Sequence, residues 1–264
     1  GTMQGPTGVR AVLFPSTFDN ATKLLNVKSQ KFVGVVTYGV GAIGLQAPRT
    51  ANSFLPEFDE ELTKEAAEGD GRLSVEVFAA KLGAFFLRQW TDAGMPNPAP
   101  NNEEMFFIVG GYDEKAAYGR VFELSVPGSP NPVERMEDGN FGALYGGQRE
   151  ITDRLLQGFD SRIPDLAQEL LGIPAKARKT DLADQLKKRL TVAIPWQLLP
   201  LQDCVDLSIF VVRSTILLQQ WLVGIRGVGG AVDVATITRT RGFKETQVKQ
   251  VTGDKESMRR HRED

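Results

Sequence analysis

The sequence contains one histidine and one cysteine, so imidazole and thiol chemistry has almost no candidate residues. Its single histidine, His261, lies in the charged tail of residues 258–264, outside every predicted strand and helix. A Ser-His-Asp relay, a Cys-His relay and a His-ligated metal site each need an imidazole inside the fold. Those classes of site are therefore excluded. Any catalysis has to use lysine, carboxylates, hydroxyls or an amine, and we expect no cofactor and no metal.

Among the side chains that could take part in catalysis, Lys23 is the candidate that the sequence singles out. It lies in a predicted strand, next to Leu24 and Leu25. A lysine ammonium that is partly removed from water has a lowered pKa and can assist proton transfer. A lysine in a strand is more often an edge or solvent-facing residue. The local pattern therefore leaves both interpretations open.

A glycine-rich segment, Gly39-Val-Gly-Ala-Ile-Gly44, follows the next predicted strand and precedes a predicted helix. Its G-x-G-x-x-G spacing is that of the dinucleotide-binding fingerprint. A Rossmann unit, however, returns to a parallel strand that ends in an acid, whereas this chain continues into a second helix. We therefore interpret the segment as an edge whose bare backbone can approach a ligand or a neighbouring strand.

The elements that position these residues follow from the hydrophobic pattern. Residues 22–27 and 31–38 predict a hairpin, and apolar residues at helical spacing predict helices over 48–66 and 75–94. Further predicted elements are strands at 104–111, 117–126 and 142–145, turns at 127–132, polar helices over 149–190, an apolar helix over 201–223 that packs against a sheet, and a closing hairpin of 232–238 with 243–248.

The order of strands, two helices, strands, helices and strands argues against a doubly wound parallel sheet, in which strands and helices alternate. It predicts an α+β fold, a four-layer αββα sandwich with two antiparallel sheets between helical layers. We expect one domain over 1–250, with a helical elaboration at about 160–190 and a charged tail at 251–264.

The composition limits which binding partners and which cellular compartment we expect. The chain has 264 residues, with 31 Lys and Arg against 33 Asp and Glu, so its net charge of -2 provides no basic field for nucleic acid or an anionic membrane. Cys204 is the single cysteine and favours a reducing compartment. No run of about 18 apolar residues occurs. We expect a cytoplasmic protein that binds neither nucleic acid nor membrane.

The arrangement of the lysine, the glycines and the paired helices resembles the proteasome β-type subunits, particularly their bacterial proteasome-like members, within the N-terminal nucleophile hydrolases. The segments that carry the resemblance are 19–27, 31–39 and, near the other end, the apolar helix, Gly229-Gly230 and the strands at 232–238 and 242–248. The resemblance covers most of the chain.

In that family an amino-terminal threonine supplies both the nucleophilic hydroxyl and, through its α-amine, the base, so no histidine is required. The resemblance implies a threonine-type peptidase or amide hydrolase acting on a peptide or amide substrate. Lys23 corresponds to the family's strand lysine and Gly39 to its oxyanion-hole glycine. Thr37, Tyr38 and Gly41 would border the substrate pocket.

Two features depart from the family pattern. The strand that bears the nucleophile has no counterpart here, and Thr2 is a poor nucleophile because Gly1 occupies its amine. The family's Asp-x-x-Ser-Gly-Gly motif is replaced by Ile225-Arg-Gly-Val-Gly-Gly230. The alternatives are therefore an incomplete copy of a hydrolase, a non-catalytic ring subunit that serves assembly or binding, and an unrelated binding protein.

The resemblance also implies a homo-oligomeric ring. Apolar helix faces that include Phe85, Phe86 and Trp90 would need a cover, which a second copy could supply. The alternative is that these aromatic side chains pack on the chain's own sheet.

Overall fold

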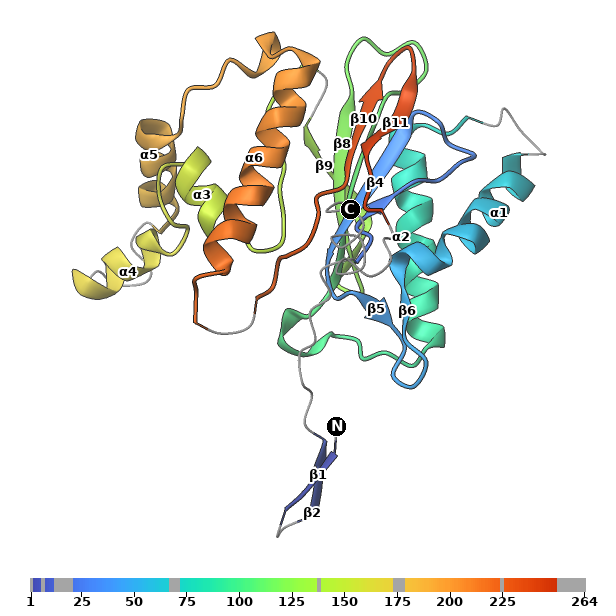
Figure 1. The fold of residues 1–264 in the computed structure, drawn as a ribbon, viewed down its shortest axis with the longest axis horizontal. Helices are drawn as coiled ribbons and strands as arrows, with labels where there is room; N and C mark the ends of the chain where they lie inside the picture. Colours follow the sequence, from blue (N-terminus) through green and yellow to red (C-terminus); the bar gives the residue numbers. More distant parts are fainter. Residues whose placement is uncertain are drawn as a thin grey trace, which may run out of the picture. The chain divides into compact units, whose positions relative to one another are not determined.

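A computed structural model describes residues 2–5, 8–11, 21–66, 72–136, 139–172, 179–223 and 226–250 (Figure 1). The chain divides into two compact units. The sheet unit comprises Thr22–Asp138 and Ala231–Asp264, and the helical unit comprises Gly1–Ala21 and Gly139–Gly230. A single domain over residues 1–250 stays a prediction, and His261 lies outside the described residues.

The sheet unit is built on one antiparallel sheet of five strands in the order β3-β4-β7-β8-β9. The predicted hairpin of β3 and β4 is confirmed, with Leu24 opposite Val36 and Leu25 opposite Val35. The strands of this sheet are β3 (Leu24–Leu25), β4 (Val33–Gly39), β7 (Met105–Gly111), β8 (Arg120–Val126) and β9 (Ser129–Met136).

Two helices cover one face of this sheet. They are α1 (Leu55–Ala66), preceded by the 3-10 turn η1 (Ala51–Phe54), and α2 (Val75–Asp92). The hydroxyl of Ser74 caps α2 by accepting a hydrogen bond from the Val77 N–H at 3.2 Å. The apolar residues of α2 recur at helical spacing and meet alternate residues of β7 and β8, because strand side chains alternate between faces. The shared core includes Phe58, Phe78, Leu82, Phe86, Trp90, Phe107, Val109, Phe122 and Leu124.

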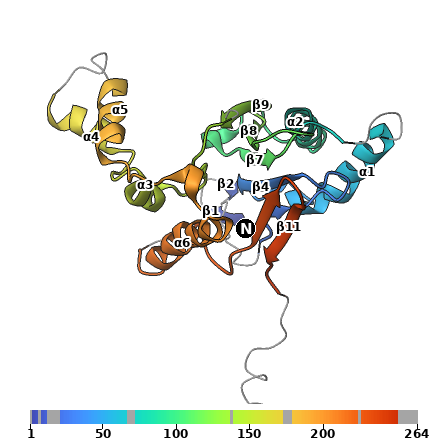
Figure 2. The ribbon, with the colours of Figure 1, turned by 90° about the horizontal axis from the view of Figure 1, so that it is seen from above.

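The closing hairpin of β10 (Val234–Thr238) and β11 (Gly242–Gln247) lies on the other face of the sheet. Gly34 faces it, and a Cβ atom at Gly34 would stand 2.7 Å from the Phe243 ring and 2.9 Å from the Ile237 side chain. Val33 and Val35, on either side of Gly34, belong to the helix-covered core. Figure 2 shows α2 and β11 on different sides of β4. Glycine at position 34 therefore allows the hairpin to lie close to the sheet.

The helical unit contains the remaining helices and a separate two-stranded pairing. Within it, α3 contacts α6 and α4 contacts α5. Two arginines, Arg154 and Arg162, bind the Asp160 carboxylate that precedes α4 and hold its pKa well below the usual range. The elements are β1 (Thr2–Gly5), β2 (Gly8–Ala11), α3 (Glu150–Leu156), α4 (Ile163–Leu170), α5 (Lys179–Leu190), the 3-10 turn η3 (Trp196–Leu198) and α6 (Leu201–Gln219).

The coarse fold prediction is confirmed, since the structure is mixed α+β with antiparallel pairing throughout the described strands. The expected turn within 127–132 is found at residues 127–128, between β8 and β9, although β9 already begins at Ser129. One element prediction is wrong: the expected strand at 142–145 is irregular backbone. The remaining short elements are β5 (Ala42–Ile43), β6 (Arg49–Thr50) and the 3-10 turn η2 (Pro100–Asn102). The fourth layer of the sandwich stays a prediction.

The aromatic residues expected at a ring contact are buried inside the sheet unit. Phe85, Phe86 and Trp90 are at most 2% exposed. The Phe86 ring lies 4.6 Å from that of Phe107 and 5.3 Å from that of Phe85. The expectation that these side chains need a cover from a second copy is therefore wrong, because the chain's own sheet supplies it.

Candidate functional site

Strand pairing places Lys23 beside the end of β4. Lys23 directly precedes β3, and its carbonyl oxygen accepts a hydrogen bond from the Thr37 N–H at 2.9 Å. Residues that lie opposite each other in an antiparallel pair share a face of the sheet. Lys23 is therefore on the same face as Thr37.

Burial and a neighbouring cation lower the pKa of the Lys23 ammonium. Partial burial is the larger cause, because removal from water disfavours the charged form, and the positive charge of Lys249 adds to it. Lys249 itself is held by Asp233, through its Nζ at 3.3 Å from Oδ2 and through its backbone N–H, which donates to Oδ1 at 2.8 Å. The two side chains are 17% and 9% exposed.

Asp233 and Lys249 were not identified from the sequence. Asp233 precedes β10 and Lys249 follows β11, so the closing hairpin brings them together. The available signal was an acid inside an otherwise apolar run, between Val232 and Val234. Lys249, held in place by Asp233, thus adds a positive charge from a distant segment of the chain to the surroundings of Lys23.

Gly39 ends β4 in a conformation that requires glycine. Its φ is 80°, and a Cβ atom there would collide with the carbonyl oxygen of Glu104. The Val40 N–H donates to that same oxygen at 3.0 Å, on the β7 side. Because successive N–H groups of a strand point to opposite sides, the Gly39 N–H points to the β3 side, where Lys23 lies.

Thr37 and Tyr38 lie on opposite faces of β4. The buried Thr37 side chain donates its hydroxyl hydrogen bond to the Phe106 carbonyl at 2.9 Å. The Tyr38 ring stacks on Phe106, with centroids 4.9 Å apart, and its hydroxyl donates to Glu123 Oε1 at 2.6 Å. Thr37 is thus grouped with Lys23 and the Gly39 N–H, and Tyr38 belongs to the other face. Gly41 is exposed, and a Cβ atom there would meet nothing within 4 Å.

The glycine-rich segment does not lead directly into a helix. After Gly41 the chain forms β5, which pairs antiparallel with β6, before η1 and α1 begin. A dinucleotide site needs its glycines at the amino-terminal end of a helix, where the pyrophosphate binds. The structure therefore favours the interpretation of this segment as a sheet edge.

In the helical unit, Gln219 holds the loop that carries the second glycine motif. Its Oε1 accepts hydrogen bonds from the N–H groups of Gly227 at 3.0 Å and Val228 at 2.9 Å, and its Nε2 donates to Gln148. Gln219 is 7% exposed. A glutamine on α6 thus anchors this loop.

Replacing Gln219 by leucine is expected to speed amide hydrogen exchange at Gly227 and Val228 about fivefold, since each N–H loses an acceptor worth about 1 kcal/mol. Exchange measured by NMR or mass spectrometry checks this. The matched control is Gln220→Leu, a change of the exposed neighbour that leaves both amides unaffected. Equal effects of the two changes would contradict the anchoring role of Gln219.

Neither a metal centre nor a membrane span is found in the described ranges. No group of three or more His, Cys, Asp or Glu side chains among these residues is placed to hold a metal ion. None of the described helices combines the length and the apolar composition that crossing a membrane requires.

Comparison with known proteins does not assign the chain to a family. No protein-family model matches the chain, and a search of curated proteins finds no match.

Proposed function

We propose that this chain is a subunit of a proteasome-like N-terminal nucleophile hydrolase that cleaves peptide or amide bonds. The observation that carries the proposal is the pairing of Lys23 with the end of β4. A partly buried lysine with a lowered pKa lies opposite Thr37, and the Gly39 N–H points to the same side of the strand. Resemblance to the family supports the same assignment.

In the proposed mechanism the nucleophile is the hydroxyl or thiol of an amino-terminal Thr, Ser or Cys residue that precedes this sequence. Its α-amine takes the proton from the attacking group and later passes it to the leaving amine. The ammonium of Lys23 lowers the pKa of that α-amine, because a nearby positive charge disfavours protonation. The amine is then free to act as a base near neutral pH.

Gly39 is proposed to stabilise the tetrahedral intermediate. Its N–H would donate to the oxyanion that forms on the attacked carbonyl, a contribution worth about 3–4 kcal/mol in comparable hydrolases. Thr37 would border the pocket for the substrate side chain on the Lys23 side. Lys249, which Asp233 holds in place, adds a positive charge near Lys23.

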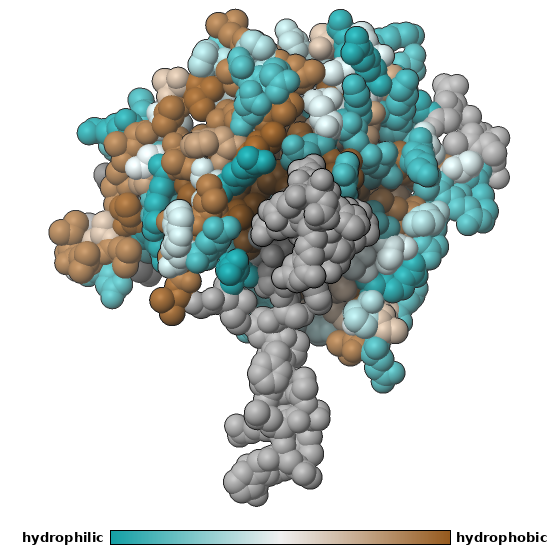
Figure 3. All heavy atoms as spheres, in the orientation of Figure 1, coloured by the Kyte–Doolittle hydropathy of each residue, from teal (hydrophilic) through white to brown (hydrophobic). Residues whose placement is uncertain are grey.

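The second candidate is a non-catalytic ring subunit. The observation that favours it is Val228, an apolar residue at the position where the family motif has a hydroxyl, in a loop held by Gln219. Such a subunit would keep the fold for assembly. Apolar side chains available for contact with another copy include Phe210, Leu217 and Trp221, which are exposed on and beside α6. Figure 3 shows apolar residues, in brown, gathered where α6 lies in this view.

The experiment that separates the two uses the natural gene product with its own amino terminus. Light scattering measures its mass, and a panel of fluorogenic peptides measures hydrolysis on the same sample. A ring that hydrolyses peptides and loses activity on acetylation of its α-amine supports the hydrolase. A ring without hydrolysis supports the non-catalytic subunit, and a monomer without hydrolysis contradicts both.

A further inference from the structure

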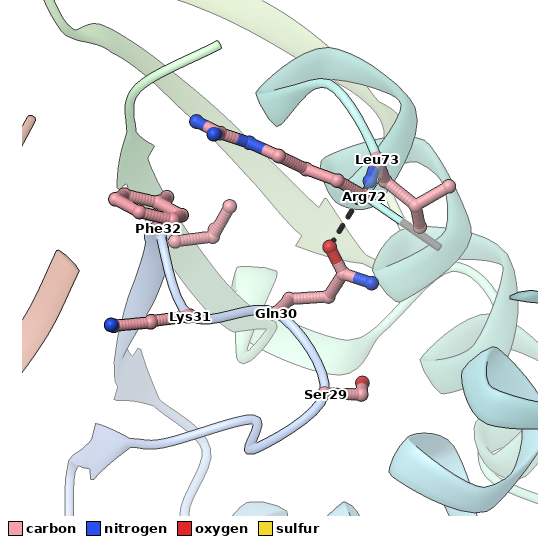
Figure 4. A pocket seen from close by; sticks show the side chains of 7 residues that line it. Ser29, Gln30, Lys31, Phe32, Arg72 and Leu73 are labelled. Atoms are coloured by element: carbon pink, nitrogen blue, oxygen red, sulfur yellow. Dashed lines mark hydrogen bonds between the residues drawn. The ribbon is translucent and has the colours of Figure 1, made fainter. Parts of the chain in front are cut away.

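A second candidate site lies at the opposite end of β4 from Gly39. A pocket of about 320 Å³ is lined by the turn before β4 and by the segment before α2 (Figure 4). Because β4 spans Val33–Gly39 at about 3.3 Å per residue, this pocket is about 20 Å from the Gly39 end. The lining residues are Ser29, Gln30, Lys31, Phe32, Val33, Arg72 and Leu73.

Hydrogen bonds hold the two walls of this pocket in fixed positions. Gln30 is 3% exposed, and its Oε1 accepts a hydrogen bond from the Leu73 N–H at 3.1 Å, which joins the turn to the segment before α2. The Ser29 N–H donates to Asp59 Oδ1 at 3.0 Å. The backbone of both walls is therefore preorganised, and a ligand would not have to order it.

Two cationic side chains flank one aromatic ring in this pocket. The Arg72 guanidinium lies 4.1 Å from the centre of the Phe32 ring, and the Lys31 ammonium lies 5.7 Å from it. Figure 4 shows both side chains extending to the same side, with the Phe32 ring between them. The ring restrains both side chains through cation–π contacts.

Both cations keep donors for a ligand. Arg72 donates from one terminal nitrogen to the Tyr112 carbonyl at 2.8 Å, and a guanidinium has five N–H donors. Among the described residues, none has a carboxylate within ion-pair distance of Lys31 or Arg72. Lys31 and Arg72 therefore have no ion-pair partner among the described residues.

The turn of the closing hairpin brings two further cations to this end of the sheet unit. The Phe243 N–H donates to the Lys31 carbonyl at 2.7 Å, so the β10–β11 turn lies against Lys31. Arg239 and Arg241 belong to this turn, and both are exposed. Cations from three separate segments of the chain thus lie at one end of the sheet unit.

We propose that the Lys31–Arg72 pocket binds the phosphate group of a small molecule. A phosphate dianion has enough oxygen atoms to accept paired hydrogen bonds from the planar guanidinium of Arg72 and a further one from the ammonium of Lys31. A pocket of about 320 Å³ also has room for a small body attached to the phosphate. The site is independent of the proposed hydrolase activity.

The test titrates the full chain with inorganic phosphate at pH 7.5 and constant ionic strength, followed by calorimetry and by the NMR signal of the Arg72 side chain. Saturable binding is expected. Lys31→Met and Arg72→Met are each expected to weaken it about 10-fold or more, because charge-assisted hydrogen bonds are lost. Arg72→Lys keeps the charge without the paired donors and is expected to give an intermediate loss.

The matched control is Lys28→Met, which removes the same charge from an exposed lysine outside the pocket lining. It is expected to change the affinity less than twofold. Equal weakening by Lys28→Met and Lys31→Met would assign the effect to the general field and overturn the proposal. Acetate that binds as tightly as phosphate, or phosphate that does not saturate, would overturn it as well.

Discussion

Lys23→Ala is expected to lower the turnover of a fluorogenic peptide by the natural gene product about 1,000-fold, within the range by which general acid–base groups contribute. Without the neighbouring ammonium, the α-amine of the nucleophilic residue regains the pKa of an ordinary amino terminus, about 8. More of it is then protonated at neutral pH and cannot act as a base. Steady-state rates as a function of pH measure the effect.

The pH profile distinguishes this role from a loss of structure. In Lys23→Ala the acidic limb of the residual activity is expected to move to higher pH, whereas a misfolded protein would lose rate at every pH. Lys28→Ala serves as the control, because Lys28 is an exposed lysine in the turn that follows β3. Turnover by Lys23→Ala equal to that of the unmodified protein would exclude the proposed hydrolase mechanism.

Phe86→Ala is expected to lower the free energy of unfolding of the sheet unit by about 3–5 kcal/mol, the usual cost of truncating a fully buried aromatic residue. Phe86 is 0% exposed and lies between α2 and the sheet, with its ring near those of Phe54, Phe85 and Phe107. Urea denaturation followed by tryptophan fluorescence measures the change, since Trp90 is buried in the same helix.

The control for this prediction is Val77→Ala, which removes an apolar side chain that is 44% exposed on the same helix. Its expected effect is within about 0.5 kcal/mol. A loss from Phe86→Ala no larger than that from Val77→Ala would show that α2 does not carry the core of the sheet unit.

The sheet and its two helices could be predicted because their sequences repeat with a clear period. Apolar residues of α2 recur every three or four positions, and β7 alternates between fully and partly buried residues. Lys23 and Gly39 were assigned their roles through the resemblance to the family, and the pairing of Lys23 with the end of β4 is given by the structure. The order of strands and helices along the chain then indicated that the strands pair antiparallel.

Other features could not be predicted because they depend on contacts between distant segments. Prolines usually indicate turns, yet Pro130 and Pro132 lie inside β9. The sheet tolerates them because β9 is an edge strand, where a residue without an N–H need not break a hydrogen bond between strands. Four residues at 142–145 were too few to distinguish a strand from irregular backbone. The Asp233–Lys249 pair could not be predicted because its two residues are 16 positions apart in the sequence and only the closing hairpin brings them together.

Because the last hairpin packs against Gly34, the sheet is synthesised before the strands that cover one of its faces. The segment Gly139–Gly230, which forms most of the helical unit, is encoded between β9 and β10, so the ribosome releases the five-stranded sheet long before the strands that cover its second face. Until then the nascent sheet exposes the surface around Gly34 to other chains. The late arrival of Ile237 and Phe243 makes the final step of folding a long-range closure, which is slow compared with local helix formation.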